Sequence, residues 1–247
     1  EDITLQGKSG NNASLVQVKG GATLDMQDNS LITGNTSSAS GGGVSVARDG
    51  TLTISGGTIS GNTSSGDGGG VSVASGGALT MSGGEISGNT SSGSSSHGGG
   101  VYINGGTFTM TGGTISGNST PSSGDGGNRG GGGVFVTNGG TFTMSRGEIS
   151  GNTSNQDGGG VFVYGSGTLF TMSGGEISGN GAKYGGGIYA STSGKFIMTG
   201  GVVYGSDAAD KKNTAPNGAM MYGHQGGSAT LGGATSGTRN TTIDLRE

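Results

Sequence analysis

The sequence predicts an all-β protein, a single right-handed parallel β-helix of about eight rungs with three short strands in each rung. A glycine-rich motif recurs along almost the whole chain. Within each copy, apolar and polar residues alternate with the two-residue period of strands, and no segment has a helical period. The chain has 64 glycines, 2 prolines and 28% hydrophobic residues, yet those apolar residues recur regularly, which is not typical of disorder.

The repeat is clearest at a triple glycine that precedes an apolar anchor residue. Successive anchors from Val44 to Ile188 are 27, 30, 33, 27 and 27 residues apart, a spacing typical of stacked repeats. Leucine-rich repeats share this period, but leucines are too few here for their framework. The anchors are Val44, Val71, Val101, Val134, Val161 and Ile188, with Val16 and Met220 as weaker copies at the two ends.

Each copy contains three segments with strand character. In the copy that begins at Val44, the alternation points the valines of residues 44–46, then Leu52 and Ile54, then Ile59 inward. Parallel rungs stack about 4.8 Å apart, so equivalent residues form continuous inner columns. The predicted columns are Ile54, Met81, Met110, Met144, Met172 and Met198; Leu52, Leu79, Phe108, Phe142, Phe170 and Phe196; and Ile59, Ile86, Ile115, Ile149, Ile177 and Val203.

Asparagines recur at one corner of the repeat. Because Asn tolerates left-handed backbone geometry and its amide can bond to an identical neighbour, a structural ladder is predicted. The ladder comprises Asn35, Asn62, Asn89, Asn118, Asn152 and Asn180, with Ser206 in the same column. The alternative is that the NTS and NST triplets at this corner are glycosylation acceptors.

Charge and composition restrict the chemistry that we expect. The chain has no cysteine, its two histidines are 127 residues apart, and its net charge of −4 is unclustered. We therefore expect no metal site, no cofactor, no nucleic-acid partner and no membrane insertion. Glu148 and Glu176 fall on adjacent rungs with Glu85 in the same column, which leaves a shared cation or a solvated face as alternatives.

Two outward-facing features are candidates for interaction. Aromatic residues replace serine at the outward position of the first strand, and we expect an exposed stripe for binding or assembly, or strand-stabilising neighbours. This stripe comprises Tyr102, Phe135, Phe162, Tyr189 and Met221. Long loops beside it make rungs 3 to 5 the best candidate surface. The second feature is a threonine column formed by Thr53, Thr80, Thr109, Thr143 and Thr171, which resembles ice-binding arrays.

The GG[TE]ISGN and GGGV[YF][IV] segments resemble the right-handed β-helix repeats of bacterial surface proteins, including adhesin-like and autotransporter-like regions. The resemblance covers about residues 13 to 235. It implies a non-catalytic extracellular protein of the bacterial cell surface, a rigid stalk or adhesin segment or a self-assembling fibre subunit. A carbohydrate-active enzyme and an ice-binding protein are the alternatives.

The whole chain, residues 1–247, is predicted to form one domain. Residues 1–13 and 236–247 would form its ends or caps around repeats in 14–235. Because the end rungs of a β-helix have unpaired edges, the expected partners are further copies of the chain, head-to-tail or lateral, or a surface glycan or protein.

Overall fold

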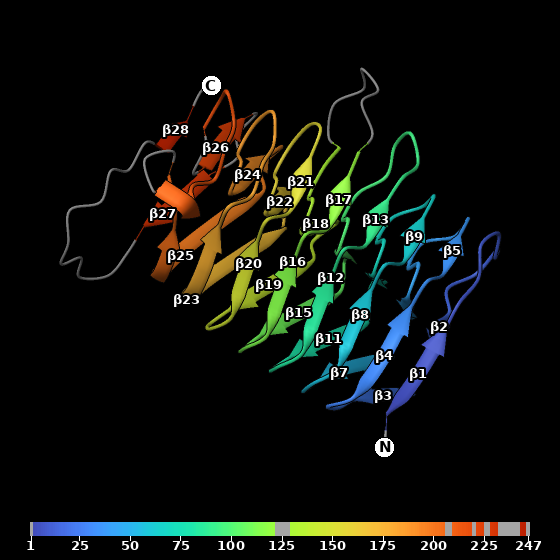
Figure 1. Ribbon diagram of the computed structural model, residues 1–247. Coiled ribbons are helices and arrows are strands. Elements are labelled where there is room, and N and C mark those ends of the chain that lie inside the picture. Colours follow the sequence, from blue (N-terminus) through green and yellow to red (C-terminus); the bar gives the residue numbers. More distant parts are fainter. Residues whose placement is uncertain are drawn as a thin grey trace.

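The computed structural model describes residues 2–121, 129–205, 209–218, 221–224, 228–231 and 243–245. It is a parallel β-solenoid of about seven turns, slightly fewer than the eight predicted. The turns stack along one axis, with strands of successive turns side by side (Figure 1). The fold class predicted from the repeat is therefore confirmed.

The strands of the described residues form three sheets. The strand that follows the triple glycine builds a nine-stranded sheet. Its members are β2 (Val16–Val18), β6 (Val44–Val46), β10 (Val71–Val73), β14 (Val101–Asn104), β18 (Val134–Thr137), β22 (Val161–Tyr164), β24 (Ile188–Ser191), β26 (Met221–His224) and β28 (Ile243–Leu245).

The second and third strands of each turn belong to a 14-stranded sheet, because β23 (Leu169–Ser178) and β25 (Lys195–Val203) run through both positions. The second position holds β3 (Thr23–Met26), β7 (Thr51–Ile54), β11 (Ala78–Met81), β15 (Thr107–Met110), β19 (Thr141–Met144) and β27 (Ser228–Leu231). The third holds β1 (Ile3–Gln6), β4 (Ser30–Thr33), β8 (Thr58–Ser60), β12 (Glu85–Ser87), β16 (Thr114–Ser116) and β20 (Glu148–Ser150).

A short strand after the Asn corner forms a five-stranded sheet. Its members are β5 (Thr36–Ser37), β9 (Thr63–Ser64), β13 (Thr90–Ser91), β17 (Ser119–Thr120) and β21 (Thr153–Ser154). A 3-10 turn, η1 (Ala209–Lys211), lies between β25 and β26. At the N-terminal end, β1 pairs in parallel with β4 and adds a partial turn to the stack.

The predicted inner columns are confirmed by strand register and burial. Leu79 pairs with Leu52 and Phe108, and Met81 pairs with Ile54 and Met110. All members of the three columns are buried except Met198, which is partly buried against the same core. A narrow interior filled by stacked apolar residues of similar kind explains how a chain with so few apolar residues folds.

The triple glycine serves two backbone requirements. Its first residue has positive φ, 71° at Gly68, which L-residues with a Cβ disfavour. Its second residue lies so close to the next turn that a Cβ on Gly69 would sit 2.4 Å from the Gly99 carbonyl oxygen. These contacts explain the recurrence of the motif.

The anchor of the turn after Ile188 is Met221 and not Met220. Met221 pairs with Ile188 and is buried in the core, so its predicted place in the outward stripe was wrong. The triple glycine is reduced here to Gly218, whose φ of 58° matches the first glycine of other turns. Counting from Gly218 moves the anchor by one residue and places Tyr222 beside Tyr189 in register.

Candidate functional site

One edge of the solenoid gathers varied side chains at the position just before the triple glycine. The residue there changes from turn to turn. From the second member onward, the backbone carbonyl accepts a hydrogen bond from the glycine that follows the preceding member, as the His97 carbonyl does from the Gly68 N–H at 2.8 Å. We call this set the edge column: Ser40, Asp67, His97, Gly130, Asp157, Tyr184 and Asn217. Its titratable members His97 and Tyr184 contact aromatic rings of the first-strand sheet.

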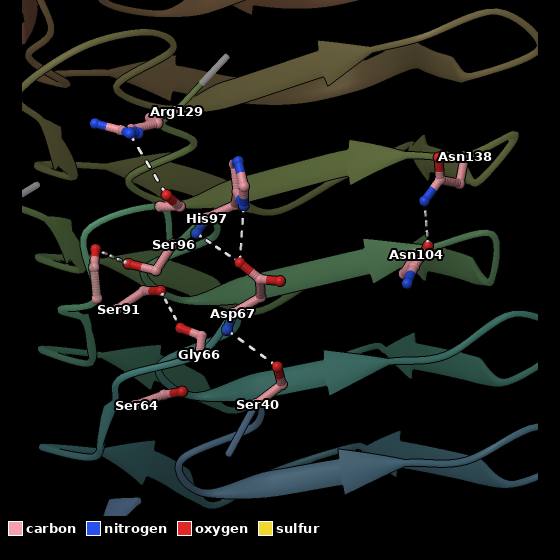
Figure 2. A network of polar contacts seen from close by, with 12 residues as sticks. Ser40, Ser64, Gly66, Asp67, Ser91, Ser96, His97, Asn104, Arg129 and Asn138 are labelled. Carbon is pink, nitrogen blue, oxygen red and sulfur yellow. Dashed lines mark hydrogen bonds and ion pairs between the residues drawn. The ribbon is translucent and has the colours of Figure 1, made fainter. Parts of the chain in front are cut away.

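Asp67 links three turns of the edge column (Figure 2). Its backbone N–H donates to Ser40 Oγ at 3.1 Å, and its Oδ1 accepts the backbone N–H of His97 at 2.9 Å. The His97 Nδ1 atom lies 2.8 Å from the same oxygen. Tyr102 also donates a hydrogen bond to the Asp67 side chain. Burial, reinforced by the charge of Asp67 and this bond, raises the pKa of the Tyr102 phenol.

The imidazole of His97 packs against two neighbouring rings of the first-strand sheet, which also contact each other. Its centroid is 4.4 Å from that of Phe135 and 6.0 Å from that of Tyr102. The Asp67–His97–Tyr102 group therefore fastens the connection before β14 onto the outer face of the sheet. Sequence reasoning missed this group, although His97 and Asp67 share the position before a triple glycine.

The predicted aromatic stripe is a buried cluster and not an exposed surface. Phe135, Phe162 and Tyr189 are 2%, 0% and 5% exposed, and Tyr102, Tyr164 and Tyr184 pack against them. We call these six residues the outer aromatic cluster. Chain from the edge column covers the rings, as His97 and Tyr184 show by their ring contacts. The expectation of an exposed stripe at Tyr102, Phe135, Phe162 and Tyr189 was therefore wrong, because the connections fold back over it.

Asp157 is the most deeply placed carboxyl of the edge column. The residue is 7% exposed, and its burial raises the pKa of the carboxyl to about 7, although the charge of Lys183 opposes that rise. Its backbone N–H donates to the Arg129 carbonyl at 3.0 Å, and its carbonyl accepts from Gly131 at 2.9 Å. Backbone hydrogen bonds thus hold Asp157 in a buried environment, which destabilises the ionised form of its carboxyl group.

The asparagines form a continuous ladder inside the Asn corner. The backbone N–H of Asn89 donates to Asn118 Oδ1 at 2.9 Å, and its Nδ2 donates to the same oxygen at 3.0 Å and to the Ile59 carbonyl at 2.9 Å. The members Asn35, Asn62, Asn89, Asn118, Asn152 and Asn180 are all 0% exposed. A glycan on Nδ2 does not fit these folded corners, which disfavours the glycosylation alternative.

The ladder continues beyond the residues that the repeat suggested. Asn180 donates to Asn213 Oδ1, so Asn213 takes the column position that was assigned to Ser206, which lies outside the described residues. At the other end, Asn11 Nδ2 donates to Asn35 Oδ1. The Asn-Thr pair at 213–214 repeats that at 62–63 and could have identified Asn213 from the sequence.

A lysine forms an ion pair with one member of the acidic column. Glu148 and Glu176 pair in register, and Lys211 Nζ donates to the two carboxylate oxygens of Glu176 at 2.9 and 3.0 Å. Glu85 lies two turns from Glu148, with Thr114 in the turn between them. The positive charge beside the Glu148–Glu176 pair is therefore the ammonium group of Lys211.

The threonines of the second-strand position are aligned in register. Thr53, Thr80, Thr109, Thr143 and Thr171 pair successively, and Thr107 and Thr141 form a second, shorter column. Thr109 and Thr143 are exposed. The face ends at β25, where Lys195 and Ile197 replace the pattern.

Comparisons with known proteins do not place the chain in a family. No family model, curated protein or solved structure matches it. Within the described residues, no group of three or more histidine, cysteine or acidic side chains could hold a metal ion. The same residues contain no helix long and apolar enough to cross a membrane.

Proposed function

We propose that the chain is a rigid, non-catalytic segment of a bacterial extracellular surface protein, a stalk or adhesin-type spacer. The observation that carries the proposal is the unbroken inner stack. Core residues and Asn ladder pair turn by turn from Asn35 to Asn213. A coil of this kind has no internal boundary at which it would bend, and each turn adds about 4.8 Å of length.

The faces of such a spacer would carry its contacts. The buried outer aromatic cluster does not offer flat rings to a glycan, so a glycan or protein partner would meet the exposed edge and the Ser/Thr-rich sheet faces. Lateral or head-to-tail pairing with further copies would extend the spacer into a fibre. A carbohydrate-active enzyme would need a cluster of acids and bases on one face. Of the two acid–base groups described above, Asp67 with His97 is engaged in packing the edge, and Glu176 is ion-paired with Lys211.

Single-molecule pulling between handles at the two ends tests the rigid-spacer proposal. We expect no extension at low force, followed by successive short lengthening steps as turns unravel from an end. Phe142→Ala, which interrupts the inner stack, should create a weak point in the middle of the rod. A low-force extension of the wild-type chain, as from a hinge, would contradict the proposal.

A polysaccharide panel separates the spacer from an enzyme. We expect no release of reducing ends or unsaturated products by the purified chain. Cleavage that is lost in Asp67→Asn or Asp157→Asn, with the fold retained by circular dichroism, would replace the proposal with the enzyme alternative.

The aligned threonines favour ice binding as a second candidate. The two columns place hydroxyl and methyl groups at regular intervals on a parallel sheet. Regular spacing of this kind suits the repeating lattice of ice better than it suits a flexible ligand. Thermal hysteresis that disappears in a Thr109→Lys and Thr143→Lys double variant would support it. Unchanged ice growth at high protein concentration would dismiss it.

A further inference from the structure

The edge column contains two aspartates in equivalent positions with different surroundings. Asp67 and Asp157 both precede a triple glycine. The next member of the column after Asp67 is His97, whose backbone N–H and ring bond the carboxylate. The next member after Asp157 is Tyr184, and the previous one is Gly130, which has no side chain. Equivalent positions thus hold a carboxylate that is hydrogen-bonded by His97, at Asp67, and a carboxyl group that is buried, at Asp157.

The groups around Asp157 provide little stabilisation for its charge. On the C-terminal side, Lys183 and Tyr184 face it, and Lys183 is the cation that lowers its pKa. On the N-terminal side, the Arg129 carbonyl bonds its backbone N–H. Lys183 itself is exposed and lies over the Tyr184 ring, 5.4 Å from the centroid. An ionised Asp157 is therefore more stable where water can reach it.

We propose that residues 155–158 act as a pH-responsive latch over the outer aromatic cluster, closed when the Asp157 carboxyl is protonated and loosened when it is ionised. The mechanical link runs through Tyr184. Gly158 N–H donates to the Tyr184 carbonyl at 2.9 Å, and Tyr184 N–H donates back to the Gln156 carbonyl at 3.1 Å. The Tyr184 ring packs against Tyr189, so movement of this edge uncovers buried rings.

The direction of the pH effect follows from the pKa values. Burial raises the carboxyl pKa to about 7 from an ordinary value of 3.8, so the closed form holds its proton more tightly than an open form. As the pH rises from about 4 to 7, the open form loses its proton first and opening is favoured. Above about 7 both forms are ionised and the equilibrium levels off.

Hydrogen exchange by mass spectrometry across a pH series tests the latch on the intact chain. After correction for intrinsic exchange rates, opening at Gly158 and Tyr184 should increase about tenfold to a hundredfold between pH 5 and 8.5. Asp157→Asn, which mimics the neutral carboxyl, should keep these amides protected with no more than about a twofold change. Lys183→Met, which removes the nearby cation, should make opening at pH 8.5 more extensive than in wild type.

Asp67→Asn is the matched control, and it should leave the pH dependence at Gly158 and Tyr184 intact. The same pH dependence in Asp157→Asn as in wild type would overturn the latch, as would wild-type protection that does not change with pH. If Asp157→Asn fails to fold, carbon NMR titration of the wild-type Asp157 carboxyl decides: a midpoint near 7 supports the proposal, and one near 4 overturns it.

Discussion

The inner phenylalanine column and the outer aromatic cluster are both buried, yet their rings pack differently. Inside, Phe108, Phe142 and Phe170 stack with centroids 4.5 Å apart and planes within 7° of parallel. Outside, Phe162 meets Phe135 and Tyr189 edge-on, with centroids 4.8 Å apart and interplanar angles of 79° and 68°. The strand spacing is the same in both regions, so the walls around the rings make the difference.

The walls of the inner column are built from similar apolar residues in each turn, and Phe108, Phe142 and Phe170 therefore adopt nearly the same arrangement. The outer cluster is closed on one side by connections of unequal length, with five residues between Asn62 and the next triple glycine but eight after Asn89. Each outer ring consequently meets a different neighbour. Periodic sequence gives periodic packing only where every surrounding element is also periodic.

The largest contrast should come from removing one ring in each region. Phe142→Ala leaves a cavity that the three sheets cannot fill, and we expect it to lower the free energy of unfolding by about 4 kcal/mol. Phe162→Ala should cost less, about 2 kcal/mol, because the covering connection can move inward. Urea denaturation followed by circular dichroism measures both variants. Equal losses would remove the distinction between the two regions.

The Asn ladder should be the next most sensitive feature. Asn118→Ala deprives Asn89 of the side-chain oxygen that accepts its N–H and Nδ2 hydrogens and removes the Nδ2 hydrogen bond to the Ile86 carbonyl. Each unpaired buried group costs about 1 kcal/mol or more, so we expect a total loss of about 3 kcal/mol.

Asn104→Ala is the control for this prediction, because the hydrogen bond that its Oδ1 accepts from Asn138 is exposed and should contribute no more than about 0.5 kcal/mol. Urea denaturation of the two variants at one pH makes the comparison. A loss from Asn118→Ala as small as that from the control would show that the ladder contributes little stability.

A stabilising change is expected in the turn between β24 and β25. Thr192 and Ser193 have φ values of 52° and 65°, a region that favours Asn and Gly. The equivalent turn after β18 contains Asn138 and Gly139, with φ values of 54° and 76°. Replacing Thr192 by Asn and Ser193 by Gly should raise the free energy of unfolding by about 1 kcal/mol. A lower thermal midpoint for the double variant would mean that the native side chains make compensating contacts.

The smallest effect should come from Lys211→Met. The ammonium bonds Glu176 at the surface, where water and salt screen the interaction. Thermal melting should show a slightly lower midpoint at low salt and no difference from wild type in high salt. A large loss that salt does not reduce would assign Lys211 a packing role.

The inner region was predictable because its residues alone define a period. Leu52, Phe108 and Ile115 repeat with their neighbours, and the Asn corner follows at a fixed distance. The burial of Phe162 was not predictable in this way, since it depends on where connecting segments fold and not on the strand that carries the ring. The misplacement of Met221 had a local cause, the loss of two glycines after Gly218. The carboxyl groups of Asp67 and Asp157 differ in hydrogen bonding and burial because their neighbours in the adjacent turns differ. The sequence immediately around each aspartate does not contain this information.

Hydrogen exchange resolved to single amides tests the central claim that the inner stack is one continuous unit. The ladder amides of Asn62, Asn89, Asn118 and Asn152 should all exchange with the free energy of global unfolding, and the amides of the outer edge should exchange faster. Two groups of ladder amides with clearly different opening free energies would contradict the claim, because the coil would then consist of separate blocks.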